Sequence, residues 1–151
     1  MSSTLKFIAE LMIIILFIGI IFDYGQIKST KAIIKDTIDL STKAAALQID
    51  EDSTKIGSGV FEINEVQAKK VVEELFKQNT NEEFYNSLVI TTNVINAHSE
   101  QTYTSPNGQS YTISDPTVFC LVKYKYDGMV FDENITVDIM SGSVLKNKND
   151  L

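Results

Sequence analysis

An apolar stretch near the start of the chain constrains the fold more than any other feature. Residues 6–23 read KFIAELMIIILFIGIIFD, and every residue from Leu11 to Phe22 is apolar or glycine. A helix rises about 1.5 Å per residue, so roughly 20 residues cross the core of a bilayer. The stretch is long enough if Glu10 and Asp23 lie near the two interfaces. The sequence therefore predicts a single membrane-spanning helix, with Asp23 at its outer boundary.

A removable secretory signal is the first alternative to a permanent anchor. Lys6 and the apolar run match the front of such a signal, but no small-residue site of the A-x-A type follows Phe22. The alanines at 44–46 lie too far downstream, and no Cys directly follows the run to carry a lipid. We therefore expect the helix to remain in the mature protein.

The charge of the remaining chain argues against several kinds of partner. Residues 50–151 contain 16 Asp and Glu against 8 Lys, and the chain has no Arg. A net negative domain disfavours nucleic acid and anionic lipid as partners. Without Arg, bidentate binding of phosphate or carboxylate groups is not expected.

The residues that catalysis would need are largely missing. His98 is the only histidine, which excludes a His-based triad and a His-rich metal site, and we expect it on the surface. No nucleophile elbow, P-loop or dinucleotide motif is present. We therefore expect no catalytic residue, no metal, no cofactor and no small-molecule substrate, and we do not expect an enzyme.

Cys120 lies in the apolar run TVFCLVKY and is predicted to be buried, with a surface thiol that pairs between subunits as the alternative.

The chain divides into three parts by composition. Residues 1–49 form the N-terminal helix, which is predicted to continue beyond the membrane because no Pro interrupts it. Residues 50–59 form a polar linker, and residues 60–151 form an extracytoplasmic α+β domain. Apolar residues at helical intervals predict a stripe that lies under this domain: Ile27, Ile34, Ile38, Ala45 and Ile49.

The domain is expected to contain one helix and then an antiparallel sheet of about four strands. Asn64 can cap the helix with Gln67 three residues on, and the helical pattern fades at residues 79–81. Strands are predicted around residues 88–94, on either side of a turn at 106–108, at 118–126 and at 135–139. A turn at 141–143 and a short last piece at 144–145 complete the pattern. The sheet would pack against both helices.

The N-terminal segment resembles known proteins. KFIAELMIIILFIGI is similar to the start of mature type IV pilins and pseudopilins, with Glu10 at the fifth mature position and Lys6 at the first. The longer stretch GIIFDYGQIKSTKAIIKDTIDLSTKAAA resembles the TadE-like proteins of tight-adherence (Flp-type) pilus systems. Those proteins show an acidic-aromatic-Gly element, here Asp23, Tyr24 and Gly25, before an Ala-rich helix end. The resemblance covers about residues 6–48.

The resemblance implies a pseudopilin or minor pilin that is cut by a prepilin peptidase between Leu5 and Lys6. The family normally has Gly before the cut and a hydrophobic residue after it, so this chain departs from the pattern at both positions and leaves cleavage open. In the family, the glutamate at the fifth position neutralises the amino terminus of an adjacent subunit, and Glu10 would take that role after cleavage. A buried carboxylate needs such a counter-ion.

Two functions follow as hypotheses. The first is a subunit that acts in pilus or secretion-system assembly through its N-terminal helix, with the cytoplasmic membrane and other pilin or pilus-assembly subunits as partners. The second is a single-pass anchor that carries an extracytoplasmic binding module.

The orientation of the span has conflicting signals. Lys28, Lys31 and Lys35 follow the span, so the lysine count alone favours a domain on the cytoplasmic side. The resemblance and the presence of a domain after the span instead favour an extracytoplasmic domain. A surface filament is the further location that the resemblance implies.

Overall fold

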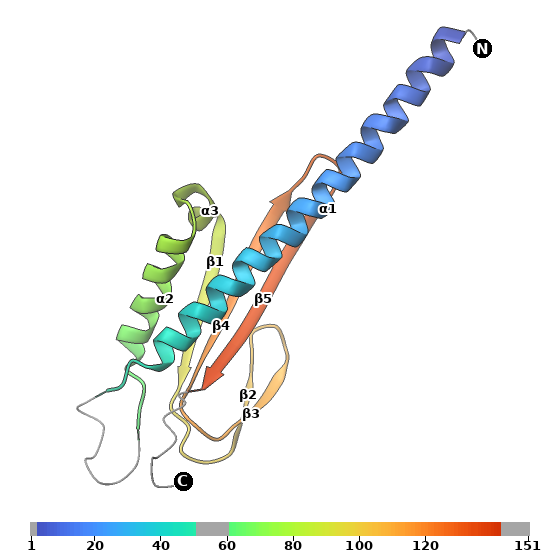
Figure 1. The fold of residues 1–151 in the computed structure, drawn as a ribbon. Coiled ribbons are helices and arrows are strands. Elements are labelled where there is room, and N and C mark those ends of the chain that lie inside the picture. Colours follow the sequence, from blue (N-terminus) through green and yellow to red (C-terminus); the bar gives the residue numbers. More distant parts are fainter. Residues whose placement is uncertain (1–2, 51–60, 143–151) are drawn as a thin grey trace, which may run out of the picture.

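The computed structural model describes residues 3–50 and 61–142, in which one long helix lies along an antiparallel sheet (Figure 1). The helices are α1 (Ser3–Ala46), α2 (Glu65–Asn79) and α3 (Glu82–Ser87). The strands are β1 (Leu88–Ile95), β2 (Gln101–Thr104), β3 (Ser110–Ile113), β4 (Thr117–Asp127) and β5 (Asp132–Gly142). The predicted α+β class is confirmed.

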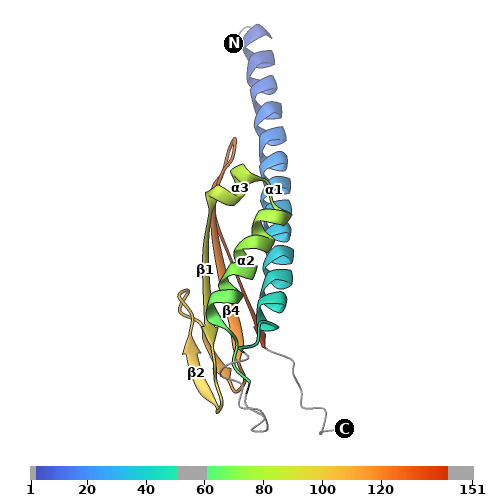
Figure 2. The same cartoon turned by 90° about the vertical axis from the view of Figure 1, so that its left-hand side faces the viewer.

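The helix α1 is continuous over 44 residues, which corresponds to about 66 Å at the usual helical rise. Its C-terminal half lies on the sheet, whereas its N-terminal half projects beyond every other described element (Figures 1 and 2). The prediction of one long helix is therefore confirmed, although α1 ends at Ala46. Ile49 lies beyond it and forms an isolated antiparallel bridge with Ile63.

The core lies between two helices and one face of a three-stranded sheet with the order β1-β4-β5. Helix α1 packs over β4 and β5, and α2 packs beside it over β1. The predicted stripe of α1 is buried from Ile27 to Ala45, and it meets Val118, Cys120 and Val122 of the central strand. Burial of these apolar side chains is the main source of stability for this arrangement.

The hairpin of β2 and β3 covers the opposite face of the sheet around Phe119, whereas Lys123 and Lys125 on the same face of β4 are exposed. Tyr103 and Tyr111 pair across this hairpin, and their rings lie 5.3 Å and 6.2 Å from the ring of Phe119 on β4. The predicted turn at 106–108 is confirmed, and Gly108 provides its positive φ of 86°. The predicted antiparallel sheet of about four strands roughly matches the five described strands, which divide into a three-stranded sheet and a separate two-stranded sheet.

Local signals account for most of the remaining boundaries. Asn64 caps α2 as predicted, since its side-chain oxygen accepts a hydrogen bond from the Gln67 N–H at 3.0 Å. The short helix α3 was not predicted, and Asn81 caps it in the same way. The predicted turn at 141–143 is wrong for its first two residues, because Ser141 and Gly142 still pair with β4. Residues 51–59 of the predicted linker and the predicted piece at 144–145 lie outside the described residues.

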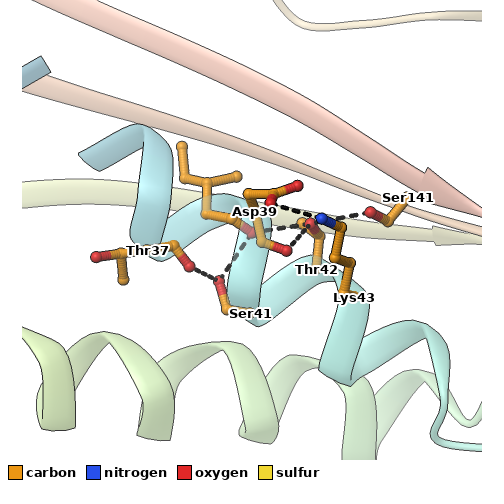
Figure 3. A network of polar contacts seen from close by, with 7 residues as sticks. Thr37, Asp39, Ser41, Thr42, Lys43 and Ser141 are labelled. Atoms are coloured by element: carbon orange, nitrogen blue, oxygen red, sulfur yellow. Dashed lines mark hydrogen bonds and ion pairs between the residues drawn. The ribbon is translucent and has the colours of Figure 1, made fainter. Parts of the chain in front are cut away.

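Hydroxyl groups at the buried end of α1 bond mainly to the helix's own carbonyls, and that of Thr42 also meets β5 (Figure 3). Ser41 donates to the Thr37 carbonyl at 2.6 Å, and Thr42 donates to the Ile38 carbonyl at 2.8 Å. The Thr42 hydroxyl also lies 3.3 Å from the hydroxyl of Ser141 on β5. These side chains satisfy their own polar groups within the helix, so they can be buried without a large cost.

Cys120 is expected to resist thiol reagents until the protein unfolds. It is fully buried in the central strand, as predicted, and burial raises the pKa of its thiol to about 11. The thiolate is the reactive form, so labelling by iodoacetamide should be roughly 100-fold slower or more in the folded protein. Mass spectrometry before and after denaturation measures this. Rapid labelling of the folded chain, or a disulfide-linked dimer, would contradict the buried position.

Candidate functional site

The N-terminal half of α1 presents an uncovered apolar surface. The large apolar side chains from Leu5 to Phe22, apart from Ile20, are exposed by between 47 % and 70 %. Within the described residues, α1 is the one helix long and apolar enough to cross a membrane, and only 6 % of its most apolar window is buried. A core helix of a soluble protein would be mostly buried, so this surface is consistent with a single-pass membrane anchor. We call residues 5–22 the apolar segment.

Glu10 and Lys6 lie within this uncovered segment, four residues apart and therefore on one side of the helix. Both side chains are exposed, and within the described chain neither takes part in an ion pair. The described part of the domain thus supplies no counter-ion for Glu10. In an apolar surrounding this carboxylate would need a counter-ion, which is either Lys6, at ion-pair spacing on the same helix, or a cation of another molecule.

Asp23 has a different environment, because the tip of the β4–β5 hairpin closes over it. Asp23 is fully buried although it is the first residue beyond the apolar segment. Its Oδ1 accepts hydrogen bonds from the Met129 N–H at 3.0 Å and the Tyr126 hydroxyl at 3.1 Å. Its Oδ2 accepts from the N–H groups of Val130 at 2.7 Å and Phe131 at 3.0 Å. We call this arrangement the Asp23 clamp, and residues 128–131 the hairpin tip.

Two glycines allow the hairpin tip to approach the helix. A Cβ atom on Gly128 would lie 2.4 Å from the Phe131 carbonyl oxygen and 2.6 Å from Oδ2 of Asp23. A Cβ atom on Gly19 would lie 2.9 Å from a methyl group of Val130. Both contacts are closer than real side chains tolerate. Gly19 and Asp23 are four residues apart on one face of α1, and the tip lies along that face.

The donors of the clamp fit an ionised carboxylate. Burial by itself raises the pKa of Asp23, but the hydrogen bonds from Val130, Met129, Phe131 and Tyr126 favour the charged form and bring the pKa below its ordinary value of 3.8. Burial and the neighbouring Asp23 raise the pKa of the Tyr126 phenol. The clamp is therefore a charge-assisted contact between the helix and the hairpin.

The other residues of the acidic-aromatic-Gly element face outwards. Tyr24 is 68 % exposed, and a Cβ atom on Gly25 would meet nothing within 4 Å. The structure thus brings Asp23 together with the hairpin tip, while Lys6, Glu10, Tyr24 and Gly25 remain uncovered. Their predicted role in assembly stays a prediction. Sequence reasoning took Asp23 as the boundary of the span and missed its role within the fold.

Outside this region, the features of the described residues that bear on ligand binding are a surface histidine and a groove beside β1. His98 lies on the surface as predicted, with its Nε2 3.2 Å from an Oε1 of Glu62. Among residues 3–50 and 61–142, no group of three or more His, Cys, Asp or Glu side chains is placed to hold a metal ion. A groove of about 550 Å³ runs beside β1 and includes Tyr85, Leu88 and Ile90 in its lining.

No family model, curated protein or solved structure matches this chain.

Proposed function

We propose that this protein is a pseudopilin-like subunit, anchored in the cytoplasmic membrane and active in pilus or secretion-system assembly through α1. The observation that carries the proposal is Glu10, a carboxylate that forms no ion pair with the described residues, on a helix half that the domain leaves uncovered. Packing of several such helices would bury the apolar surface and give Glu10 a cationic partner, such as the amino terminus of a neighbouring subunit. The domain would then lie outside the cytoplasm.

The Asp23 clamp supports a permanent anchor over a removable signal. Cleavage at the end of the apolar segment would cut α1 directly beside Asp23, whose side chain holds the hairpin tip. A signal peptide is expected to be separate from the mature fold. In this chain the apolar segment and the domain instead share one continuous helix.

Glu10→Leu is expected to block assembly while membrane insertion survives. The change removes the carboxylate that needs a counter-ion, and it leaves a helix that is still apolar and still long enough to cross the bilayer. The measurement is cross-linking of subunits in the native membrane, with alkaline extraction as the test of insertion. Glu10→Gln is the matched control for side-chain size, and it should also fail to assemble because it lacks the charge. Normal assembly of Glu10→Leu would refute the role of this residue.

The intact mass of the protein from its native membrane tests processing. A chain that lacks residues 1–5 would show cleavage before Lys6 and would provide the free amine that Glu10 requires. A chain that retains Met1 or Ser2 would favour an uncleaved accessory protein.

The groove beside β1 favours a second candidate, an anchored binding module. Among the described strands, β1 lies at the edge of its sheet, because β4 is its one neighbour. An extended peptide could add to this edge and place side chains in the groove. A plain anchor gains nothing from Glu10, so this function predicts that Glu10→Leu still binds its partner normally.

A further inference from the structure

The hairpin tip carries an exposed apolar cluster at an unusual place. Met129, Val130 and Phe131 are 75 %, 38 % and 45 % exposed. Three consecutive large apolar residues in a turn are unexpected on a surface that faces only water. Their backbone N–H groups are already used by Asp23, so the side chains are the part of the tip left free for contact.

The position of the tip along α1 explains this cluster. Val130 lies against Gly19, which is three residues before the end of the apolar segment. At the helical rise this places the tip about 4–5 Å inside the outer end of that segment. In both views the hairpin tip is the part of the domain that reaches farthest toward the N-terminal end of α1 (Figures 1 and 2). Asp23 and Lys28 are the first charged residues after Phe22, so the span ends between Phe22 and Lys28.

We propose that Met129, Val130 and Phe131 enter the outer interface of the lipid bilayer beside the spanning helix, as a second membrane contact. This inference rests on the proposed anchor. It adds that the domain lies against the membrane surface in one fixed orientation, with the Asp23 clamp holding the tip at this depth. The contact depends on apolar side chains, so it needs no anionic lipid, in agreement with the acidic domain.

The absence of tryptophan from the sequence permits a direct test. Phe131→Trp introduces a single tryptophan at the tip, which can be excited apart from the six tyrosines, and Val66→Trp is the matched control. Val66 is also an exposed apolar residue, 75 % accessible, but it lies at the start of α2, at the end of that helix away from the tip (Figure 1). Each full-length chain is reconstituted into protein-free phosphatidylcholine vesicles, with and without lipid brominated near the headgroup end of the acyl chain.

The indole of Phe131→Trp should be quenched by brominated lipid at least about threefold more strongly than the indole of Val66→Trp, with blue-shifted emission and poor quenching by acrylamide in water. Equal behaviour of the two reporters would overturn the proposal. So would a tip reporter that neither quencher reaches, because it would then contact protein. Met129→Trp is the second reporter if Phe131→Trp does not fold. Integration is measured separately by alkaline extraction, and a chain that fails to integrate refutes the anchor itself.

Discussion

Asp23→Asn should release the hairpin tip from α1 and lower the Tm of the full-length protein by on the order of 10 °C. The reason is that every group that contacts the Asp23 carboxylate is a hydrogen-bond donor. Both oxygens of Asp23 accept two hydrogen bonds, and all four come from N–H or O–H groups. The Asn amide has one NH₂ group, which replaces one of the two acceptor oxygens. On the Oδ2 side it would face the N–H groups of Val130 and Phe131, and both would lose their acceptor. On the Oδ1 side it would face the Met129 N–H, which loses its acceptor, and the Tyr126 hydroxyl, which can turn and accept. At least one backbone N–H is therefore left without an acceptor, and the tip must move away.

The measurement is thermal unfolding in detergent micelles, followed by circular dichroism, together with hydrogen exchange at the amides of Met129, Val130 and Phe131. These amides should lose protection before the rest of β4 and β5. Asp36→Asn is the matched control, since Asp36 is an exposed carboxylate on the same helix. It should leave Tm and tip protection unchanged. Equal Tm values for the two variants would show that the clamp does not stabilise the fold.

Local patterns in the sequence were sufficient to predict most of the fold. The apolar run, the helical stripe and the cap at Asn64 depend on residues within a few turns of one another. The same holds for the turn at 106–108. The strand predicted at 118–126 corresponds to β4, and its apolar character fits its place between β1 and β5, because a strand with neighbours on both sides loses most of its exposure. Each of these elements is confirmed in the structure.

The Asp23 clamp could not be predicted in this way. Its donors lie 103 to 108 residues away from Asp23, and three of the four are backbone N–H groups. A backbone donor leaves no mark in the sequence, since nearly every residue has one. The available signals were weak: an Asp on the same helical face as Gly19 and Ile27, and a glycine in the turn before three apolar residues.

The split of the strands into two sheets was missed for a related reason. Alternation predicts strands but does not assign their neighbours. The hairpin of β2 and β3 packs through Tyr103 and Tyr111 on Phe119, across the face of the larger sheet. That contact depends on the final arrangement of three separate strands.

The clamp joins the apolar segment to the domain as one body. Asp23 fixes the hairpin at the outer end of the segment, and Thr42 meets β5 near the other end of the sheet. Helix α1 is thus held at two points about 19 residues apart, or roughly 28 Å. In the assembly role proposed above, a force on the N-terminal half of α1 would reach the domain through both points.

Gly128→Ala should destabilise the protein by roughly 1–3 kcal/mol, because the added methyl group has no room. Its Cβ would lie 2.4 Å from the backbone oxygen of Phe131 and 2.6 Å from Oδ2 of Asp23. A backbone oxygen in a tight turn cannot move aside as the end of a flexible side chain can. The turn must therefore open, and the hydrogen bonds to Asp23 lengthen with it.

Gly25→Ala is the matched control and should have the opposite sign. Gly25 lies within α1 with open space around it, so alanine should stabilise the helix by about 0.5–1 kcal/mol. Chemical denaturation of both variants in detergent measures the difference. Similar losses for the two would refute the close approach at Gly128. If Gly25→Ala is more stable and still fails to assemble, the gap at Gly25 is needed by another helix, because nothing in the described fold fills it.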